Sequence, residues 1–328
     1  MRSTLNTLRS VIGLTLVGTI AGAQTPASSP REALLVSPAW VASHLSDPNV
    51  VLIHVGDPAK YAARHIAGAR LMEMADISVS DHSGMDMPPG MPMPSEPIKG
   101  PKNGLILEMP TAEQLRSQLA SFGISDNSRI IVYSANNWIS PTTRVVFTLD
   151  YAGLGNRVVV MDGGIEAWAR DNRPLTDVVL PPPQPGKLSA LKLRPIVVDA
   201  NYVRAHAATP GVSIVDARDA VFYDGIPSGR GGQGRLGHIP GAKSVPFSEV
   251  SEADARLKSA DQLLALFRKA GVQPGDTIVG YCHIGQQATA MLFAARTLGH
   301  PVLLYDGSFT DWEKHADLPV ENPSAKKP

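Results

Sequence analysis

The chain contains very little cysteine: Cys282 is the only thiol in 328 residues, which excludes an intrachain disulfide. It has no excess of either charge, because 30 basic residues balance 30 acidic ones, so the composition does not predict nucleic acid or another polyanion as a partner. Long apolar runs are also missing, and no segment has the ~20 apolar residues that a transmembrane helix needs. The apolar content of 43% is ample for compact cores, and the length predicts two domains.

The first 23 residues have the pattern of a secretory signal peptide. Arg2 and Arg9 provide a positive start, residues 11–20 form a short apolar core, and residues 21–23 give an A-x-A cleavage site. An uncleaved membrane anchor is the alternative, although the apolar core is too short to span a bilayer. We therefore expect an exported protein without stable membrane insertion, in a bacterium periplasmic, in a compartment that is usually oxidising.

The sequence contains an internal repeat that covers most of its length. Four segments of the first half recur in the same order in the second: 50–57 with 211–218, 65–69 with 238–242, 129–134 with 276–282, and 154–168 with 298–312 at an offset of 144 residues. In each copy, short apolar runs alternate with amphipathic stretches, such as 112–122 and 260–270. Strands that alternate with helices predict an α/β fold of two tandem domains, each a parallel sheet with helices on both faces.

We place the N-terminal domain at residues 31–177 and the C-terminal domain at 196–322. The segment between them, 178–195, is rich in proline and polar at its start, which is typical of a linker. A methionine-rich insertion at about 72–104 interrupts the first domain.

Cys282 lies in the most informative part of the chain. It ends a short apolar run, and a helical pattern begins six residues later at Ala288. The amides of a tight loop and the positive end of a helix dipole both stabilise an anion, so this position predicts a lowered thiol pKa. A lone cysteine is more often a small buried apolar residue, but the strand–loop–helix pattern favours an anion-binding loop.

The loop from Cys282 to Ala288, CHIGQQA, resembles the active-site loop of the rhodanese (sulfurtransferase) family. Gly285 stands where that family usually has glycine, and residues 34–45, LLVSPAWVASHL, are similar to the usual opening of two-domain rhodaneses. Cysteine phosphatases have a related loop but need arginine at the sixth position, which is Ala288 here, so phosphoryl transfer is disfavoured. Because the motifs occur in order over nearly the whole chain, it is identified as a member of the rhodanese family.

The resemblance implies that Cys282 carries a persulfide and is the catalytic residue. It also implies that the loop holds the substrate sulfur through six residues: His283, Ile284, Gly285, Gln286, Gln287 and Ala288. The first copy has Ser134 at the matching position and a loop four residues longer. A serine oxygen cannot shuttle sulfane sulfur, so the N-terminal domain is predicted to be catalytically inactive.

Arg218 is the second candidate for substrate binding. It ends the apolar run 214–217, at the edge where open parallel sheets bind ligands. A guanidinium there can hold a sulfonate or carboxylate with two parallel hydrogen bonds, and the family's Asp-x-Arg substrate arginine falls on this position. The alternative is a structural ion pair with Asp219 or Asp224. The first copy has Asp57 instead, which would repel an anion.

Other polar residues have weaker predicted roles. Arg230 and Arg235 are candidates for a second anion contact, or they only decorate a glycine-rich loop. His283 can be partly cationic near neutral pH, which favours an inorganic anion such as thiosulfate. His65 and His238 occur in both copies, including the inactive one, which indicates a structural role in a turn.

We therefore predict a sulfurtransferase that moves sulfane sulfur through a Cys282 persulfide. The donor is a small anion, thiosulfate first and 3-mercaptopyruvate second, and the acceptor is cyanide or a thiol. No metal or organic cofactor is required. The alternative is a module that binds or carries a persulfide for a partner without turnover.

The methionine-rich insertion indicates a third possibility. Prolines and glycines exclude regular structure there, and thioether sulfurs with a histidine are soft ligands that suit Cu(I). The candidate copper ligands are His82, Met85, Met87, Met91 and Met93. A flexible loop whose methionines pack loosely or scavenge oxidants is the other interpretation. On the copper hypothesis, the protein handles copper on a rhodanese scaffold.

Overall fold

The computed structural model of the protein describes residues 29–82, 98–227 and 234–325. The expected signal segment, Arg230 and four of the candidate copper ligands (Met85, Met87, Met91 and Met93) lie outside these ranges. Within them, no helix combines the length and the apolar character needed to cross a bilayer.

Each half of the chain contributes one sheet. The strands of the first sheet are β1 (Leu35–Val36), β2 (Val50–Val55), β3 (Arg70–Met72), β4 (Arg129–Ser134) and β5 (Val158–Met161). Those of the second are β6 (Val197–Val198), β7 (Val212–Asp216), β8 (Lys243–Ser244), β9 (Thr277–Tyr281) and β10 (Val302–Tyr305).

Helices alternate with these strands along the chain. The first half has α1 (Pro30–Leu34), α2 (Pro38–His44), α3 (Pro58–Ala63), α4 (Ala112–Ser121), α5 (Ser140–Tyr151) and α6 (Gly164–Arg170), with 3-10 turns η1 (Met74–Asp76) and η2 (Gly155–Arg157). The second half has α7 (Ala200–His206), α8 (Ala220–Tyr223), α9 (Ala260–Lys269), α10 (Ala288–Thr297) and α11 (Ser308–Trp312), with one 3-10 turn, η3 (Phe247–Glu249).

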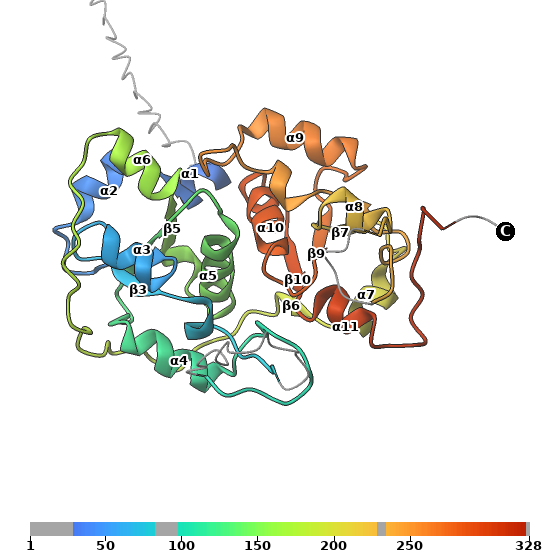
Figure 1. The fold of residues 1–328 in the computed structure, drawn as a ribbon, viewed down its shortest axis with the longest axis horizontal. Coiled ribbons are helices and arrows are strands. Elements are labelled where there is room, and N and C mark those ends of the chain that lie inside the picture. The colour runs from blue at the N-terminus through green and yellow to red at the C-terminus, as the bar shows by residue number, and fades with distance from the viewer. Residues whose placement is uncertain (1–28, 83–97, 228–233, 326–328) are drawn as a thin grey trace, which may run out of the picture.

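Both sheets are parallel and have the same topology, which confirms the predicted α/β fold and its internal repeat. The strand orders are β1-β5-β4-β2-β3 and β6-β10-β9-β7-β8. β4 therefore takes the same central place in the first sheet as β9 in the second, and β2 the same place as β7. Figure 1 shows the two halves beside each other, blue to green on the left and yellow to red on the right.

The two amphipathic stretches form helices that begin in the same way. Thr111 and Ser259 are the N-cap residues of α4 and α9, and each accepts the backbone N–H of a glutamine three residues later. Each glutamine side chain accepts the backbone N–H of its cap residue in return, so both helices start with a capping box. The amphipathic stretches 112–122 and 260–270 of the sequence thus begin as helices at caps that involve only neighbouring residues.

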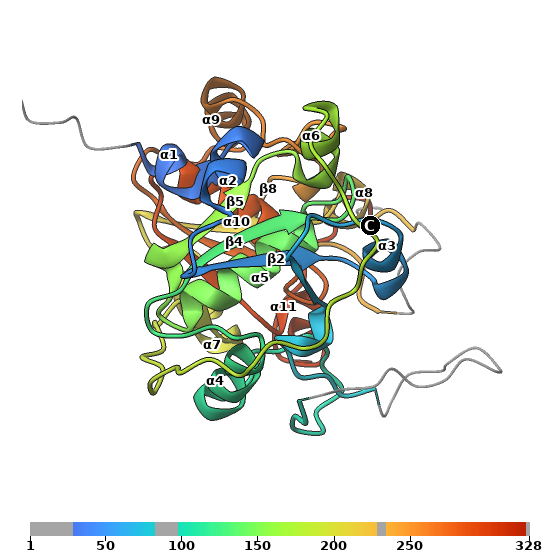
Figure 2. The ribbon, with the colours of Figure 1, turned by 90° about the vertical axis from the view of Figure 1, so that its left-hand side faces the viewer.

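Helices cover both faces of each sheet. In the first half, Val41 of α2 and Trp168 of α6 pack in one apolar cluster with the outer face of the sheet. On the other face, α4 and α5 pack in a separate cluster. The second half repeats this pattern, with α7 and α11 on its outer face and α9 and α10 on its inner face. Figure 2 shows β5, β4 and β2 side by side in front of α5 and α10.

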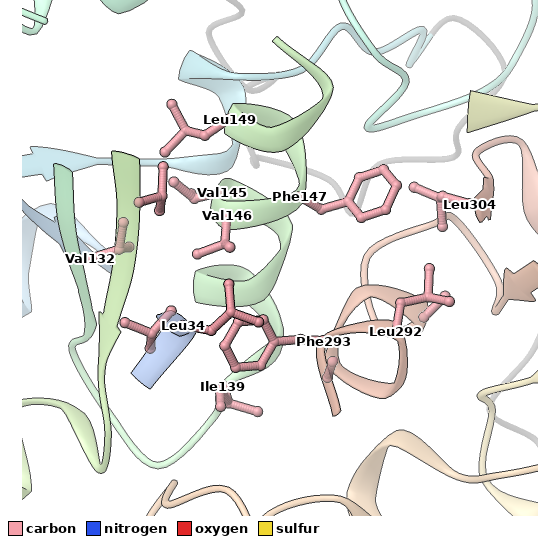
Figure 3. Close-up of a cluster of buried hydrophobic side chains, with 14 of the residues drawn as sticks. Leu34, Val132, Ile139, Val145, Val146, Phe147, Leu149, Leu292, Phe293 and Leu304 are labelled. Carbon is pink, nitrogen blue, oxygen red and sulfur yellow. The ribbon is translucent and has the colours of Figure 1, made fainter. Parts of the chain in front are cut away.

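The two inner faces form one continuous core. α5 and α10 pack against each other between the sheets, and a single apolar cluster contains buried residues of both halves. Figure 3 shows Phe293 of α10 pointing toward α5, and Phe147 of α5 pointing toward Leu304 of β10. The loops that precede α5 and α10 are therefore held close to the junction between the halves.

Candidate active site

Cys282 directly follows β9, at the carboxyl end of the central strand of the second sheet. Its N–H donates to Ser308 Oγ at 3.2 Å, and its carbonyl accepts the N–H of Phe309 at 3.0 Å. The carbonyl of His283 accepts the N–H of Thr310 at 3.1 Å. The first residues of α11 thus fix the backbone of Cys282 and His283, the first two residues of the loop.

The loop between β9 and α10 turns its amides toward the thiol. The N–H groups of Ile284, Gly285, Gln287 and Ala288 hydrogen bond to the Cys282 sulfur, and each of them lowers the pKa of the thiol. Gly285 has φ = +77°, and a Cβ on it would lie 2.7 Å from the carbonyl oxygen of Asp306. Glycine is required at this position because any side chain would be both strained and crowded.

The pKa of Cys282 is nevertheless raised above that of a free thiol. The residue has no exposed surface, and burial penalises the thiolate by more than the four amides stabilise it. The predicted lowering of the thiol pKa was therefore wrong. The loop amides favour an anion as expected, but the sequence did not show how completely the surrounding chain would enclose the sulfur.

Arg218 is buried and paired with Asp216. Its Nε lies 3.0 and 3.1 Å from the two carboxylate oxygens, and its Nη2 lies 2.6 Å from Asp216 Oδ2. Nη2 also donates to the carbonyl of Gly237 at 2.7 Å. A structural ion pair was one alternative, but the partner is Asp216 and not Asp219 or Asp224. Residues two apart in a nearly extended chain point to the same side, which makes this pairing possible.

The remaining terminal nitrogen of Arg218 faces no protein acceptor. Within the part of the chain that the structure describes, Nη1 makes no hydrogen bond. The guanidinium carbon lies 4.1 Å from the ring centre of Phe309, the residue whose N–H holds the Cys282 carbonyl. Its charge also interacts with Cys282. One arm of Arg218 is thus fixed to Asp216, and the other is available to a ligand beside the thiol.

His283 is neutral. Burial and, to a smaller extent, the positive charge of Arg218 lower its pKa to about 4. Its ring makes an edge contact with Phe222, with ring centres 4.6 Å apart at 88°. The expectation that His283 is partly cationic near neutral pH was wrong, because an apolar neighbour and a buried arginine both disfavour the imidazolium.

The low pKa of His283 predicts a measurable pH dependence of stability. In the unfolded chain, His283 binds a proton below its ordinary pKa of 6.5, whereas in the folded protein it does so only below a pKa of about 4. Between these two values protonation favours the unfolded state, so acidification destabilises the fold. His283→Gln removes this effect. We compare the free energies of unfolding of the wild type and the variant. Between pH 6 and pH 5, that of the wild type should fall by about 1.2 kcal/mol more than that of the variant. Urea unfolding of both proteins at the two pH values measures it; a pH-independent difference would contradict the buried neutral ring.

Arg235 has a structural position. Its guanidinium donates to the carbonyl of Leu318 at 2.7 Å and to that of His315 at 3.4 Å, and its backbone N–H donates to Glu313. These hydrogen bonds fasten the segment before His238 to the C-terminal end of the domain. Among the described residues, Arg235 therefore gives no support to a second anion contact, and Arg230 lies outside them.

The paired histidines of the two copies have the same structural role, as predicted. His65 Nδ1 lies 2.7 Å from the carbonyl of Tyr61, and His238 Nδ1 lies 2.8 Å from that of Tyr223. Each ring stacks on the tyrosine whose carbonyl it contacts. Since the arrangement is the same in both halves, each histidine stabilises the turn in which it lies.

The first copy has no thiol at the equivalent place. Ser134 ends β4, as Cys282 follows β9, and its Oγ is buried 2.7 Å from Thr142 Oγ1. The constant offset of 144 residues matches Ala288, one of the four residues whose amides contact the Cys282 sulfur, with Arg144. Arg144, although it belongs to the first copy, contacts the loop that holds Cys282 in the second copy.

Arg144 and Asp306 are the residues that the sequence analysis missed. Arg144 lies in α5, is fully buried, and crosses the junction to reach Asp306 Oδ1 at 2.7 Å and the carbonyl of Gly285 at 3.3 Å. An arginine among the apolar residues of RVVFTLDY signals a buried partner, because an unpaired buried charge is costly. Nothing local indicates that this partner lies in the other half of the chain.

The copper prediction is not tested by the described residues. His82 is the only one of the five candidate ligands among them. Over residues 29–82, 98–227 and 234–325, no group of three or more histidine, cysteine or acidic side chains is arranged to hold a metal ion.

Comparison with known proteins agrees with this architecture. The family model of the rhodanese-like domain matches residues 37–171 and 199–315, one match in each half. The 3-mercaptopyruvate sulfurtransferase of Escherichia coli K12 is 30% identical over 294 residues, which covers 86% of this chain and 95% of that protein. The thiosulfate sulfurtransferase of Azotobacter vinelandii is 27% identical over 293 residues, 88% and 97% of the two chains.

One further relative and one solved structure extend the comparison. The sulfur carrier protein TtuD of Thermus thermophilus is 28% identical over 302 residues, 88% of this chain and 96% of that protein. The crystal structure of SseA from Escherichia coli superposes with a TM-score of 0.66 at 26% identity, and the match covers 84% of this chain and 98% of that one.

Proposed function

This chain belongs to the rhodanese family, and on that premise we propose that it is a sulfurtransferase that carries sulfane sulfur on Cys282 as a persulfide. One observation carries the proposal: four loop amides point at the Cys282 sulfur. Such a ring of donors stabilises an anionic sulfur, either the attacking thiolate or the terminal sulfur of the persulfide. Sulfur transfer requires the thiolate and then the persulfide to be stabilised at the same position in the loop.

The reaction has two steps. In the first, the Cys282 thiolate attacks the outer sulfur of thiosulfate; a new sulfur–sulfur bond forms on Cys282, and sulfite leaves with the electron pair of the bond that breaks. In the second, cyanide or a thiolate attacks the terminal sulfur of the persulfide, and the Cys282 thiolate leaves. Both steps are thiol–disulfide-type exchanges through a covalent enzyme intermediate.

The free arm of Arg218 is the proposed contact for the donor anion. Nη1 makes no hydrogen bond to any residue that the structure describes, while Asp216 fixes the other side of the guanidinium. A sulfonate or carboxylate oxygen bound there would lie near Cys282, since Arg218 is close enough to interact with the charge of the Cys282 thiolate when it forms. Because the thiol has no exposed surface, the donor reaches it only when neighbouring side chains move aside.

The donor we propose is thiosulfate, with 3-mercaptopyruvate second. The relatives include an enzyme named for each. His283 adds no positive charge, so the binding of either anion depends on Arg218 and the loop amides. A comparison of kcat/KM for the two donors, with cyanide as acceptor, tests the choice. We expect thiosulfate to have the higher value and the kinetics to be ping-pong; a higher value for 3-mercaptopyruvate would reverse the order.

A persulfide carrier is the second candidate. The full enclosure of the Cys282 thiol favours it, because an enclosed persulfide is protected from small nucleophiles. A relative named as a sulfur carrier protein points the same way. Steady-state turnover of thiosulfate with cyanide decides between the two. A sulfurtransferase continues to turn over, whereas a carrier releases one equivalent of sulfur and then stops.

A further inference from the structure

Arg144 connects the thiol-less half of the chain to the loop that holds Cys282. Its Nη1 donates to Asp306 Oδ1 at 2.7 Å and to the carbonyl of Gly285 at 3.3 Å. Its Nη2 donates to the carbonyl of Leu107. One fully buried guanidinium therefore joins α5, the segment before α4 and the catalytic loop.

Both acceptors in the second half belong to segments that contact Cys282. The N–H of Gly285 hydrogen bonds to the Cys282 sulfur while its carbonyl accepts from Arg144, so the arginine holds a residue whose amide faces the thiol. Asp306 precedes Gly307 and Ser308, and Ser308 Oγ accepts the Cys282 N–H. A Cβ on Gly285 would lie 3.0 Å from Arg144 Nη1, which shows how closely the loop rests on the guanidinium.

Further contacts fix this junction from the first half. Asp306 Oδ2 accepts the N–H of Met109 at 2.7 Å, so the aspartate bridges Arg144 and the segment before α4. One residue before the arginine, Thr143 Oγ1 lies 3.0 Å from Thr289 Oγ1 in the first turn of α10. These hydrogen bonds leave the Arg144 side chain little freedom, which a positioning group requires.

A second ion pair between the same helices provides an internal reference. Asp150 near the end of α5 accepts from Arg296 near the end of α10 at 3.0 Å and also pairs with Arg194, and its carboxylate is almost fully buried. It lies six residues beyond Arg144, about 9 Å along the helix. This pair joins the halves without a described contact to the catalytic loop.

We infer that Arg144 is a positioning residue: by holding the Gly285 carbonyl and Asp306, it keeps the loop amides turned toward the Cys282 sulfur. The thiol-less half thereby completes the active site of the other half. This inference rests on the proposed function of Cys282. Other charged or titratable side chains close to the loop or to Arg144 are Asp216, Arg218, His283, Asp306 and Glu108, and none of them is substituted in the test below. Burial and the charge of Asp306 raise the pKa of Glu108, and Arg144 lowers it, so the profile of each Arg144 variant is read against that of wild type over the same pH range.

The test compares Arg144→Met and Arg144→Lys with Asp150→Asn in the full-length protein. Two quantities are measured: kcat and KM for thiosulfate with cyanide, and the pH profile of Cys282 alkylation by iodoacetamide. We expect Arg144→Met to lower kcat by about tenfold to a hundredfold, since small displacements of reacting groups have effects of that size. We also expect it to raise the apparent thiol pKa by about one unit, because fewer amides stabilise the thiolate.

Arg144→Lys should restore part of both losses, since the ammonium can still reach one of the two acceptors. Asp150→Asn should weaken the junction between the halves and leave kcat and the thiol pKa as in wild type. Arg144→Lys alone carries the test if the methionine variant does not fold, with a smaller shift in the same direction.

Two results would overturn the inference. The first is that the Arg144 variants keep the wild-type thiol pKa and differ only in a higher maximal rate of alkylation at high pH. This would mean that the substitution makes the thiol more accessible without changing the orientation of the loop amides. The second is an equal loss of kcat in Asp150→Asn. If wild type transfers no sulfur, the proposed function fails, while the alkylation profiles still decide the role of Arg144.

Discussion

Cys282→Ser is expected to abolish sulfur transfer, with a loss on the order of 10³-fold or more in kcat/KM for thiosulfate. A serine oxygen cannot form and release a persulfide, because the exchange needs a sulfur nucleophile and a sulfur leaving group at the same atom. Thiocyanate formation from thiosulfate and cyanide measures the loss. Mass spectrometry of the wild type after treatment with thiosulfate should show the addition of one sulfur atom, and the variant should show none.

The fold of this variant should remain intact. The hydrogen bonds that hold residue 282 to Ser308 and Phe309 use its backbone N–H and carbonyl, so they do not depend on the side chain. A circular dichroism spectrum and a thermal transition close to those of wild type provide the control. Sustained turnover by correctly folded Cys282→Ser would contradict the persulfide mechanism.

Arg218→Met is expected to destabilise the protein by about 3–5 kcal/mol, because breaking a buried ion pair leaves an uncompensated charge. The remaining charge is the carboxylate of Asp216, which has no exposed surface. The carbonyl of Gly237 also loses its donor. The free energy of unfolding from urea titration at pH 7 measures the change.

Two comparisons sharpen this prediction. Arg204→Met removes an exposed ion pair with Asp317, at 3.7 Å, and should change stability by less than about 1 kcal/mol. Asp216→Leu combined with Arg218→Met removes both charges and should recover much of the stability lost by the single variant. If Arg218→Met lost activity at wild-type stability, the arginine would serve the donor alone, and its structural role would be refuted.

The sequence was sufficient for the fold because its signals are local or repeated. The capping boxes at Thr111 and Ser259 set the start of α4 and α9 within four residues. The repeat with an offset of 144 residues assigned β5 and β10 the same place, and both sheets have them next to their central strand. The loop after Cys282 could be recognised for the same reason, since its amides and the start of α10 are consecutive in the chain.

What the sequence did not provide depends on contacts between distant residues. The enclosure of the Cys282 thiol and the low pKa of His283 both arise from packing that no local pattern records. Arg144 reaches Gly285 across 141 positions of the chain. The pairing of Arg218 with Asp216 is different: two positions apart at the end of a strand, it could have been proposed from the alternation of side chains.

The continuous core between the sheets also determines how this protein unfolds. Since α5 and α10 bury their apolar sides against each other, either half alone would expose a large apolar face to water. The thiol-less half is therefore needed to cover the apolar inner face of the half that carries Cys282, which would otherwise be exposed to water. Melting should accordingly proceed in one cooperative transition.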